Sequence, residues 1–370
     1  MLASLIKYFA VIVVLPALLL ASVLTMVFYG VDSKEETLPT IALLLPGKIS
    51  DPGWNRSIYL DTEKAFVQSG IAEIAVVQGV SLDNVAQAID SVRKRDIHAV
   101  ILGFDKSDKR IEKVIAANTQ MRFAGLFKTF DFYGNYSAYV PRWIFPAYMS
   151  GFAAASVSPR ARLGLVAVNR GAQSTALINA FVLGARAALP GCMVYVAGLG
   201  TAGAERSERA EREAVDRLID IWEVDSVATM STTSAVSRHA LARKIPYVGF
   251  MEAASERHPE YMIAHVRVST DRIFADMARD FEFGRFCRDE IAQYGLRSGI
   301  IGFDSFSGGI ASHVMRELRR LEEYFINDGT IFSGPILDTN GRERVSAGEV
   351  LSERAFINES WYVDGTYEVP

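Results

Sequence analysis

A chain of 370 residues, of which 50% are apolar and 22% charged, can form one large or two medium domains with substantial cores. Its formal net charge of −4 and its scattered basic residues argue against a nucleic-acid partner, because phosphate binding needs a concentrated basic surface. The cysteines, Cys192 and Cys287, match neither a disulfide framework nor a metal-ligand spacing, so we expect both to be small buried residues.

The beginning of the chain is strongly apolar. Residues 8–29 are almost uninterrupted Leu, Val, Ala, Ile and Phe, and a polar stretch follows at residues 32–36. About twenty apolar residues suffice to cross a bilayer, whereas a signal peptide has a shorter apolar region and a small-residue cleavage site. No convincing Ala-x-Ala site is visible, so residues 1–31 are either a cleaved export signal or an uncleaved anchor that holds the protein on the membrane. In both cases we expect the rest of the chain to be exported, to the periplasm or the outer face of the inner membrane.

The next residues alternate between short apolar runs and longer helical stretches. The pattern predicts strands at residues 41–45, 73–78, 99–103 and 121–127, and helices at 60–70, 82–94 and 111–118. Strands that alternate with helices of this length predict βαβ units and a parallel sheet.

After a break at residues 139–146 the same pattern starts again. We expect helices at residues 147–156, 176–188, 208–222 and 234–243, and strands at 163–168, 193–198, 226–230 and 246–250. A strand at 263–268, a helix at 270–286, a strand at 298–303 and a charged helix at 311–328 precede an extended tail. Two successive βαβ series behind an export signal are typical of bilobal binding proteins, which close on a ligand around a hinge.

One loop carries a candidate binding site. Residues 41–55 read IALLLPGKISDPGWN, so a predicted strand stops at a Pro-Gly pair and a loop then presents Asp51, Trp54 and Asn55. Open α/β sheets bind ligands at the carboxyl ends of their strands. An acid, an indole and an amide side by side suit a flat polar molecule better than a catalytic reaction. The alternative is an ordinary connecting loop in which Trp54 is partly buried in packing.

Motifs for catalysis are weak. The five histidines show no ligand spacing, and the chain contains neither a G-x-S-x-G nucleophile elbow nor a phosphate-binding G-x-x-x-x-G-K-[ST] loop. The glycine-rich run GLGTAG at residues 198–203 lacks the full G-x-G-x-x-G context of a dinucleotide site. We therefore expect a binding protein with no cofactor and no metal, rather than an enzyme.

Longer motifs support this interpretation. The segment LLLPGKISDPGWNRSIYLDTEKA, the segment AYMSGFAAA followed by LGLVAV, and the closing IFSGPILDTNGRERVSAGEVLS with WYVDGTYEVP occur in this order. They resemble the motifs of the basic-membrane-protein (PnrA-like, Med) family of substrate-binding proteins of ABC importers. The resemblance extends over roughly residues 41–370.

The resemblance implies a bilobal type I periplasmic-binding-protein fold, with two doubly wound parallel α/β sheets joined by a hinge. Lobe 1 would comprise residues 38–144 and about 269–297, and lobe 2 residues 145–268 and about 298–335, with a tail at 336–370 packed on the lobes. Such a protein captures a purine nucleoside or a related heteroaromatic compound such as riboflavin and passes it to separate permease and ATPase subunits. The alternative is a membrane-anchored ligand sensor or surface protein with the same fold.

The resemblance also assigns site residues. Asp51, Trp54 and Asn55 would be first-lobe contacts, and Arg267 stands where the family has a basic residue that reaches ligand hydroxyls. At the place of a ribose-reading acid the chain has Met251, with Glu252 one residue later, and this departure leaves riboflavin open as the ligand. The full set of candidate ligand-binding residues is Asp51, Trp54, Asn55, Tyr59, Phe104, Phe250, Glu252 and Arg267. Trp143, in the crossover between the two series, is expected to pack in the hinge.

Overall fold

The computed structural model describes Leu20 and residues 38–50, 54–104, 108–127, 133–167, 172–199, 208–230, 234–250, 260–286, 291–305, 310–357 and 359–370. The predicted export or anchor segment lies outside these residues except for Leu20. In the part of the chain that is described, no helix has the length and apolar character needed to cross a membrane.

Sheet A has the strand order β11-β5-β4-β3-β1-β2, and its described pairs are all parallel. Its strands are β1 (Thr40–Leu44), β2 (Glu73–Val77), β3 (Ala99–Leu102), β4 (Arg122–Gly125), β5 (Tyr136–Pro141) and β11 (Ile291–Tyr294). The helices of this lobe are α3 (Trp54–Thr62) with the π-helix η2 (Glu63–Val67), α4 (Val85–Arg93), α5 (Lys109–Ala117) and α10 (Thr270–Glu282).

Both faces of sheet A are buried, which explains why its central strands read as continuous apolar runs. Successive residues of a strand point to opposite faces. Accordingly, Ile41 and Leu43 of β1 pack into one core with Phe66 and Phe274, from η2 and α10. The alternate residues of β1 belong to a separate core with α4 and α5. The helices therefore cover the two faces in the doubly wound manner.

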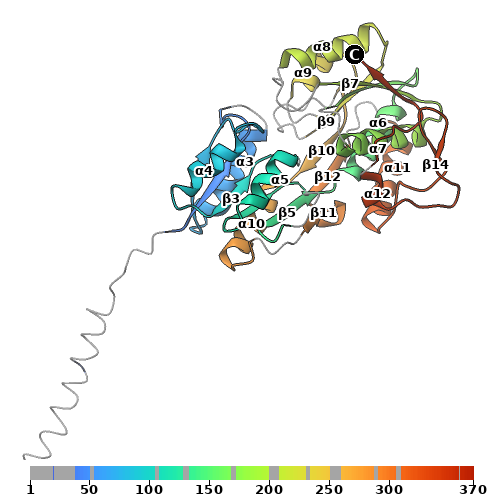
Figure 1. Cartoon of the computed structure of the whole chain (residues 1–370). Helices are drawn as coiled ribbons and strands as arrows, with labels where there is room; N and C mark the ends of the chain where they lie inside the picture. The colour runs from blue at the N-terminus through green and yellow to red at the C-terminus, as the bar shows by residue number, and fades with distance from the viewer. Residues whose placement is uncertain are drawn as a thin grey trace, which may run out of the picture. The chain divides into compact units, whose positions relative to one another are not determined.

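Sheet B has the strand order β12-β10-β9-β8-β6-β7-β15 and is parallel except for β12, which runs antiparallel to β10. Its strands are β6 (Arg162–Ala167), β7 (Met193–Gly198), β8 (Ser226–Thr229), β9 (Tyr247–Phe250), β10 (Met262–Val268), β12 (Ile301–Ser305) and β15 (Thr366–Val369). The associated helices are α6 (Ile144–Ser156), α7 (Ala172–Ala188), α8 (Glu208–Asp220), α9 (Ala235–Ala242) and α11 (Ser312–Ile326). The prediction of two parallel α/β sheets is confirmed (Figure 1).

The chain passes from sheet A to sheet B after β5, returns after β10, and passes to sheet B again after β11. Hydrogen bonds tie these connections together. The Arg142 N–H donates to the Tyr294 carbonyl over 2.9 Å, and the Ser269 N–H donates to the Ile300 carbonyl over 2.7 Å. The predicted boundaries of the two lobes remain a prediction, but these connections are where a hinge is expected.

The structure differs from the predicted elements at several places. Residues 139–146, expected to be a break, begin with the end of β5, whose residues are buried between β4 and β11. The helix expected at residues 60–70 begins at Trp54 and continues as the π-helix η2. The tail contains the hairpin strands β13 (Ile336–Leu337) and β14 (Glu343–Val345), the helix α12 (Glu353–Ile357), and β15, which brings the C-terminus beside β7 (Figure 1).

Of the cysteines, Cys192 is completely buried, as predicted, and burial raises the pKa of its thiol to about 11. Cys287 lies outside the described residues.

Candidate functional site

A narrow pocket lies where the parallel strands β8, β9 and β10 of sheet B end, next to the N-terminus of α6. This is the edge at which open α/β sheets bind ligands. The lining residues come from α6, α7 and the strand ends, and they are Trp143, Ala147, Ser150, Leu165, Leu177, Phe181, Ala228, Thr229, Met230, Phe250 and Val266.

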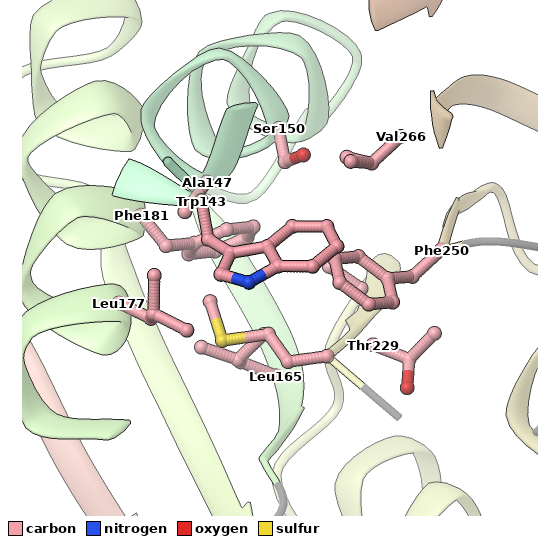
Figure 2. A pocket seen from close by; sticks show the side chains of 11 residues that line it. Trp143, Ala147, Ser150, Leu165, Leu177, Phe181, Thr229, Phe250 and Val266 are labelled. Carbon is pink, nitrogen blue, oxygen red and sulfur yellow. The ribbon is translucent and has the colours of Figure 1, made fainter. Parts of the chain in front are cut away.

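An aromatic pair dominates the pocket. Trp143 immediately precedes α6, and Phe250 is the last residue of β9. Their ring centroids are 5.1 Å apart and the ring planes are inclined by 43°. Figure 2 shows the indole in the middle of the pocket, with Phe250 on one side and Leu177 and Phe181 on the other. Both rings of the pair are only partly buried, so part of each remains available to a ligand.

The chemistry of the described lining is apolar. It contains no charged side chain, and its polar groups are the hydroxyls of Ser150 and Thr229 and the indole N–H of Trp143. The Ser150 hydroxyl donates to the Pro146 carbonyl over 2.8 Å, one turn earlier in α6. This arrangement suits the contact face of a flat, uncharged ring, because burying a polar group without a hydrogen-bond partner is costly.

Two of the predicted first-lobe residues, Trp54 and Asn55, lie at the carboxyl end of sheet A. The Trp54 indole N–H donates to the Gly103 carbonyl over 2.8 Å, which ties the start of α3 to the end of β3. The Asn55 side-chain oxygen accepts from the Gly47 N–H over 3.1 Å and so braces the loop after β1. Trp54 packs partly buried against the core, as the packing interpretation expects, and its contact with a ligand remains a prediction.

Other candidates lie apart from this loop or inside the core. The Tyr59 hydroxyl donates to the Glu63 carboxylate over 3.1 Å, and burial together with Glu63 raises the pKa of Tyr59. Phe104, which is 6% exposed, packs in the core beneath α4 and α5. Asp51 and Glu252 lie outside the described residues.

Arg267 is directed away from the aromatic pair. Its neighbour Val266 lines the pocket, and successive residues of a strand face opposite sides of a sheet. The Arg267 guanidinium extends over the edge strand β12, and a Cβ on Gly302 of that strand would lie 2.4 Å from a guanidinium nitrogen. The Arg267 Nε is 3.4 Å from a carboxylate oxygen of Asp304. Burial, with Asp304 nearby, raises the pKa of Glu322 on α11 beside this pair. The structure thus brings Phe250 together with Trp143, but not with Arg267.

Of the described lining residues, the predicted site set contained Phe250 and omitted the others, Trp143 among them. Its local sequence, YVPRWIFPAY, carries no binding motif and is equally compatible with hinge packing. Only the pairing of strands β8 to β10 places Phe250 beside it. The available signal was the position of Trp143 between the two series of strands, because a connection between two sheets starts near the ends of their strands.

Two α/β sheets linked by crossing connections, with an apolar aromatic pocket at the strand ends, form the bilobal fold of periplasmic-binding-protein-like molecules. The family model described as "ABC transporter substrate-binding protein PnrA-like" (Bmp) matches residues 38–333. The chain belongs to this family, as its motifs predicted. Members are substrate-binding proteins, which confirms the expectation that the chain is not an enzyme.

A curated relative is the purine-binding protein BAB2_0673 of Brucella abortus (strain 2308). It is 23% identical over 359 residues, covering 94% of this chain and 98% of the relative. The fold is also similar to that of a solute-binding protein of an ABC transporter system from Aeropyrum pernix K1, with a TM-score of 0.66, 16% identity, and coverage of 83% of this chain and 94% of that one. A transcriptional activator of the comK gene from Bacillus halodurans is similar as well, with a TM-score of 0.61, 14% identity, and coverage of 79% and 99%.

Proposed function

We propose that this protein is the extracytoplasmic substrate-binding component of an ABC importer, and that it captures a purine or a related flat heteroaromatic compound between its lobes. The observation that carries the proposal is the Trp143–Phe250 pair in an apolar pocket at the carboxyl edge of sheet B. The match to the substrate-binding family and the purine-binding relative support the ligand class.

The energetics are compatible with capture of a scarce nutrient. Stacking of a base on an aromatic side chain contributes about 1–3 kcal/mol. Micromolar to nanomolar binding requires roughly −8 to −12 kcal/mol, so one stacking contact is insufficient. We therefore expect further contacts from the first lobe, where Trp54 and Asn55 lie at the strand ends and Asp51 is the candidate acid. An amide can both donate to and accept from a purine or imide edge, whereas an ionised carboxylate only accepts.

The purified full chain in mild detergent provides the first test. It is denatured, the absorption spectrum of the released small molecules is recorded, and the refolded or ligand-free protein is titrated with adenine, adenosine and riboflavin by calorimetry. An ultraviolet band without visible absorption, together with micromolar or tighter binding of adenine or adenosine, is the expected result.

Other results would redirect the proposal. A yellow extract with a visible band, and binding of riboflavin alone, would assign a flavin in place of a purine. A protein that binds none of the three compounds would contradict capture of a heteroaromatic ligand.

The transport role has a separate test, because the same fold occurs in a transcriptional activator as well as in solute-binding proteins. Disruption of the gene should abolish uptake of the radiolabelled ligand at low concentration. Unchanged uptake, with a ligand-dependent change in gene expression instead, would favour the sensor alternative.

A further inference from the structure

The backbone that carries Trp143 is anchored through its preceding residue, Arg142. The backbone N–H of Arg142 donates to the Tyr294 carbonyl, and the Arg142 guanidinium forms an ion pair with Glu353 of α12. The same guanidinium lies 4.7 Å from the ring centre of Phe145. The indole therefore projects into the pocket from an anchored position, although it belongs to a connection between the two sheets.

The helices α6 and α7, which carry several of the lining residues, are packed closely against each other. A Cβ on Gly151 of α6 would lie 1.9 Å from the Phe181 carbonyl oxygen, and a Cβ on Gly184 of α7 would lie 1.9 Å from the Tyr148 carbonyl oxygen. These helices thus pack with their backbones in contact, and Ala147 and Phe181 lie close to this contact. Close-packed interiors of this kind resist deformation. A ligand must therefore be accommodated at the Trp143 and Phe250 side of the pocket.

The spacing of the aromatic pair excludes a ring between its members. Insertion of a third ring needs about 7 Å between the outer rings, because each contact takes at least ~3.5 Å. The observed centroid separation is 5.1 Å. The surface of the pair left for a flat ligand is therefore the part of each ring that remains exposed.

We propose that Trp143 is a ligand-contacting, specificity-determining residue: its indole is the platform on which sheet B receives an uncharged heteroaromatic ring. This inference rests on the proposed function and specifies which part of the ligand faces this lobe. A charged group turned toward the described lining would lose hydration without gaining a charged partner, because the polar groups there are the Ser150 and Thr229 hydroxyls and the indole N–H. The ligand's charges consequently point away from this wall.

The test compares tryptophan variants of the full chain by calorimetric titration with adenine. Trp143→Leu removes the platform and should weaken binding at least tenfold, whereas Trp143→Phe keeps an aromatic face and should stay within about threefold of the wild type. Trp222→Leu is the matched control, because Trp222 stacks on Tyr195 in a separate core and should leave adenine affinity unchanged.

Fluorescence gives a readout that a purely structural role would not change. Adenine should quench part of the tryptophan emission of the wild type and of Trp222→Phe, and this quenching should be clearly smaller in Trp143→Phe, where the contribution of Trp143 is absent and that of Trp54 remains. If Trp143→Leu does not fold, this comparison of the two phenylalanine variants decides the question.

The outcomes separate the platform from the proposed function. Wild-type adenine affinity in a folded Trp143→Leu protein, or unchanged quenching in Trp143→Phe, would overturn the platform and leave purine capture standing. Binding of riboflavin alone, with the same dependence on Trp143, would support the platform and contradict the purine assignment. If the wild type binds no flat heteroaromatic compound, both proposals fall.

Discussion

At the scale of single residues, two indoles occupy different environments. The Trp54 N–H is engaged by the Gly103 carbonyl, so this side chain helps to close the loop at the end of sheet A. Trp143 instead contacts Phe250 at the strand ends of sheet B. If both contact the ligand, Trp54 combines a binding role with a folding role, whereas Trp143 contributes mainly a ring surface.

We expect Trp54→Ala to weaken ligand binding at least tenfold without unfolding the protein, because one stacking contact is worth about 1–3 kcal/mol. Trp54→Phe retains a ring but loses the hydrogen bond to Gly103, so its loss of affinity should be smaller. Calorimetric titration and thermal unfolding of both variants measure the two effects. Wild-type affinity in Trp54→Ala would remove this residue from the site.

At the scale of elements, the hairpin of β13 and β14 is organised around one buried carboxylate. Asp338 accepts from the backbone N–H groups of Asn340 and Arg342 at 2.9 and 3.0 Å, and from the Arg344 guanidinium at 2.7 Å. Burial alone would raise the pKa of Asp338, but these donors outweigh it and hold the pKa below its usual range.

The sign of the pH dependence follows from this lowered pKa. Asp338 stabilises the folded state above its unfolded pKa of about 3.9, and this stabilisation is lost as the pH falls through the lower, folded-state pKa. Denaturant unfolding of the wild type and Asp338→Asn should therefore show their largest difference above about pH 4 and converge in stronger acid. An Asp338→Asn protein as stable as the wild type at neutral pH would contradict this role of the carboxylate.

At the scale of the whole molecule, the C-terminal residues are attached to α7 through polar contacts of one buried side chain. Asn179 of α7 is completely buried. Its side-chain amide donates to the Trp361 carbonyl over 2.8 Å and accepts from the Val363 N–H over 2.9 Å. These bonds position the chain just before β15, which then pairs with β7.

Asn179→Ala leaves the buried Val363 N–H and the part-buried Trp361 carbonyl without these partners, so we expect it to lower the free energy of unfolding by about 1–3 kcal/mol. Asn327→Ala is a suitable control, because its amide bonds the Glu323 carbonyl at an exposed helix end and its loss should cost less than about 0.5 kcal/mol. Equal stabilities of the two variants in denaturant unfolding would show that Asn179 does not secure the tail.

Much of the architecture follows from local patterns, whereas the site does so only in part. Alternating apolar runs and helical segments predict the two parallel sheets, because burial on both faces leaves a readable signal in each strand. No such signal reveals that Arg267 pairs with Asp304 across β12, or that β15 joins β7, since these contacts join residues far apart in the sequence or on neighbouring strands. Trp143 was missed for the same reason, because its partner Phe250 comes from another strand.

The strand orders also constrain the sequence of events in folding. Sheet A acquires β11, and sheet B acquires β12 and β15, from the last part of the chain. Contacts between such distant segments carry a high loop-closure cost and slow the folding rate. During synthesis, β5 and β7 emerge early and keep open edges until the last strands arrive. A nascent chain of this topology therefore keeps unpaired strand edges until its last strands have been synthesised.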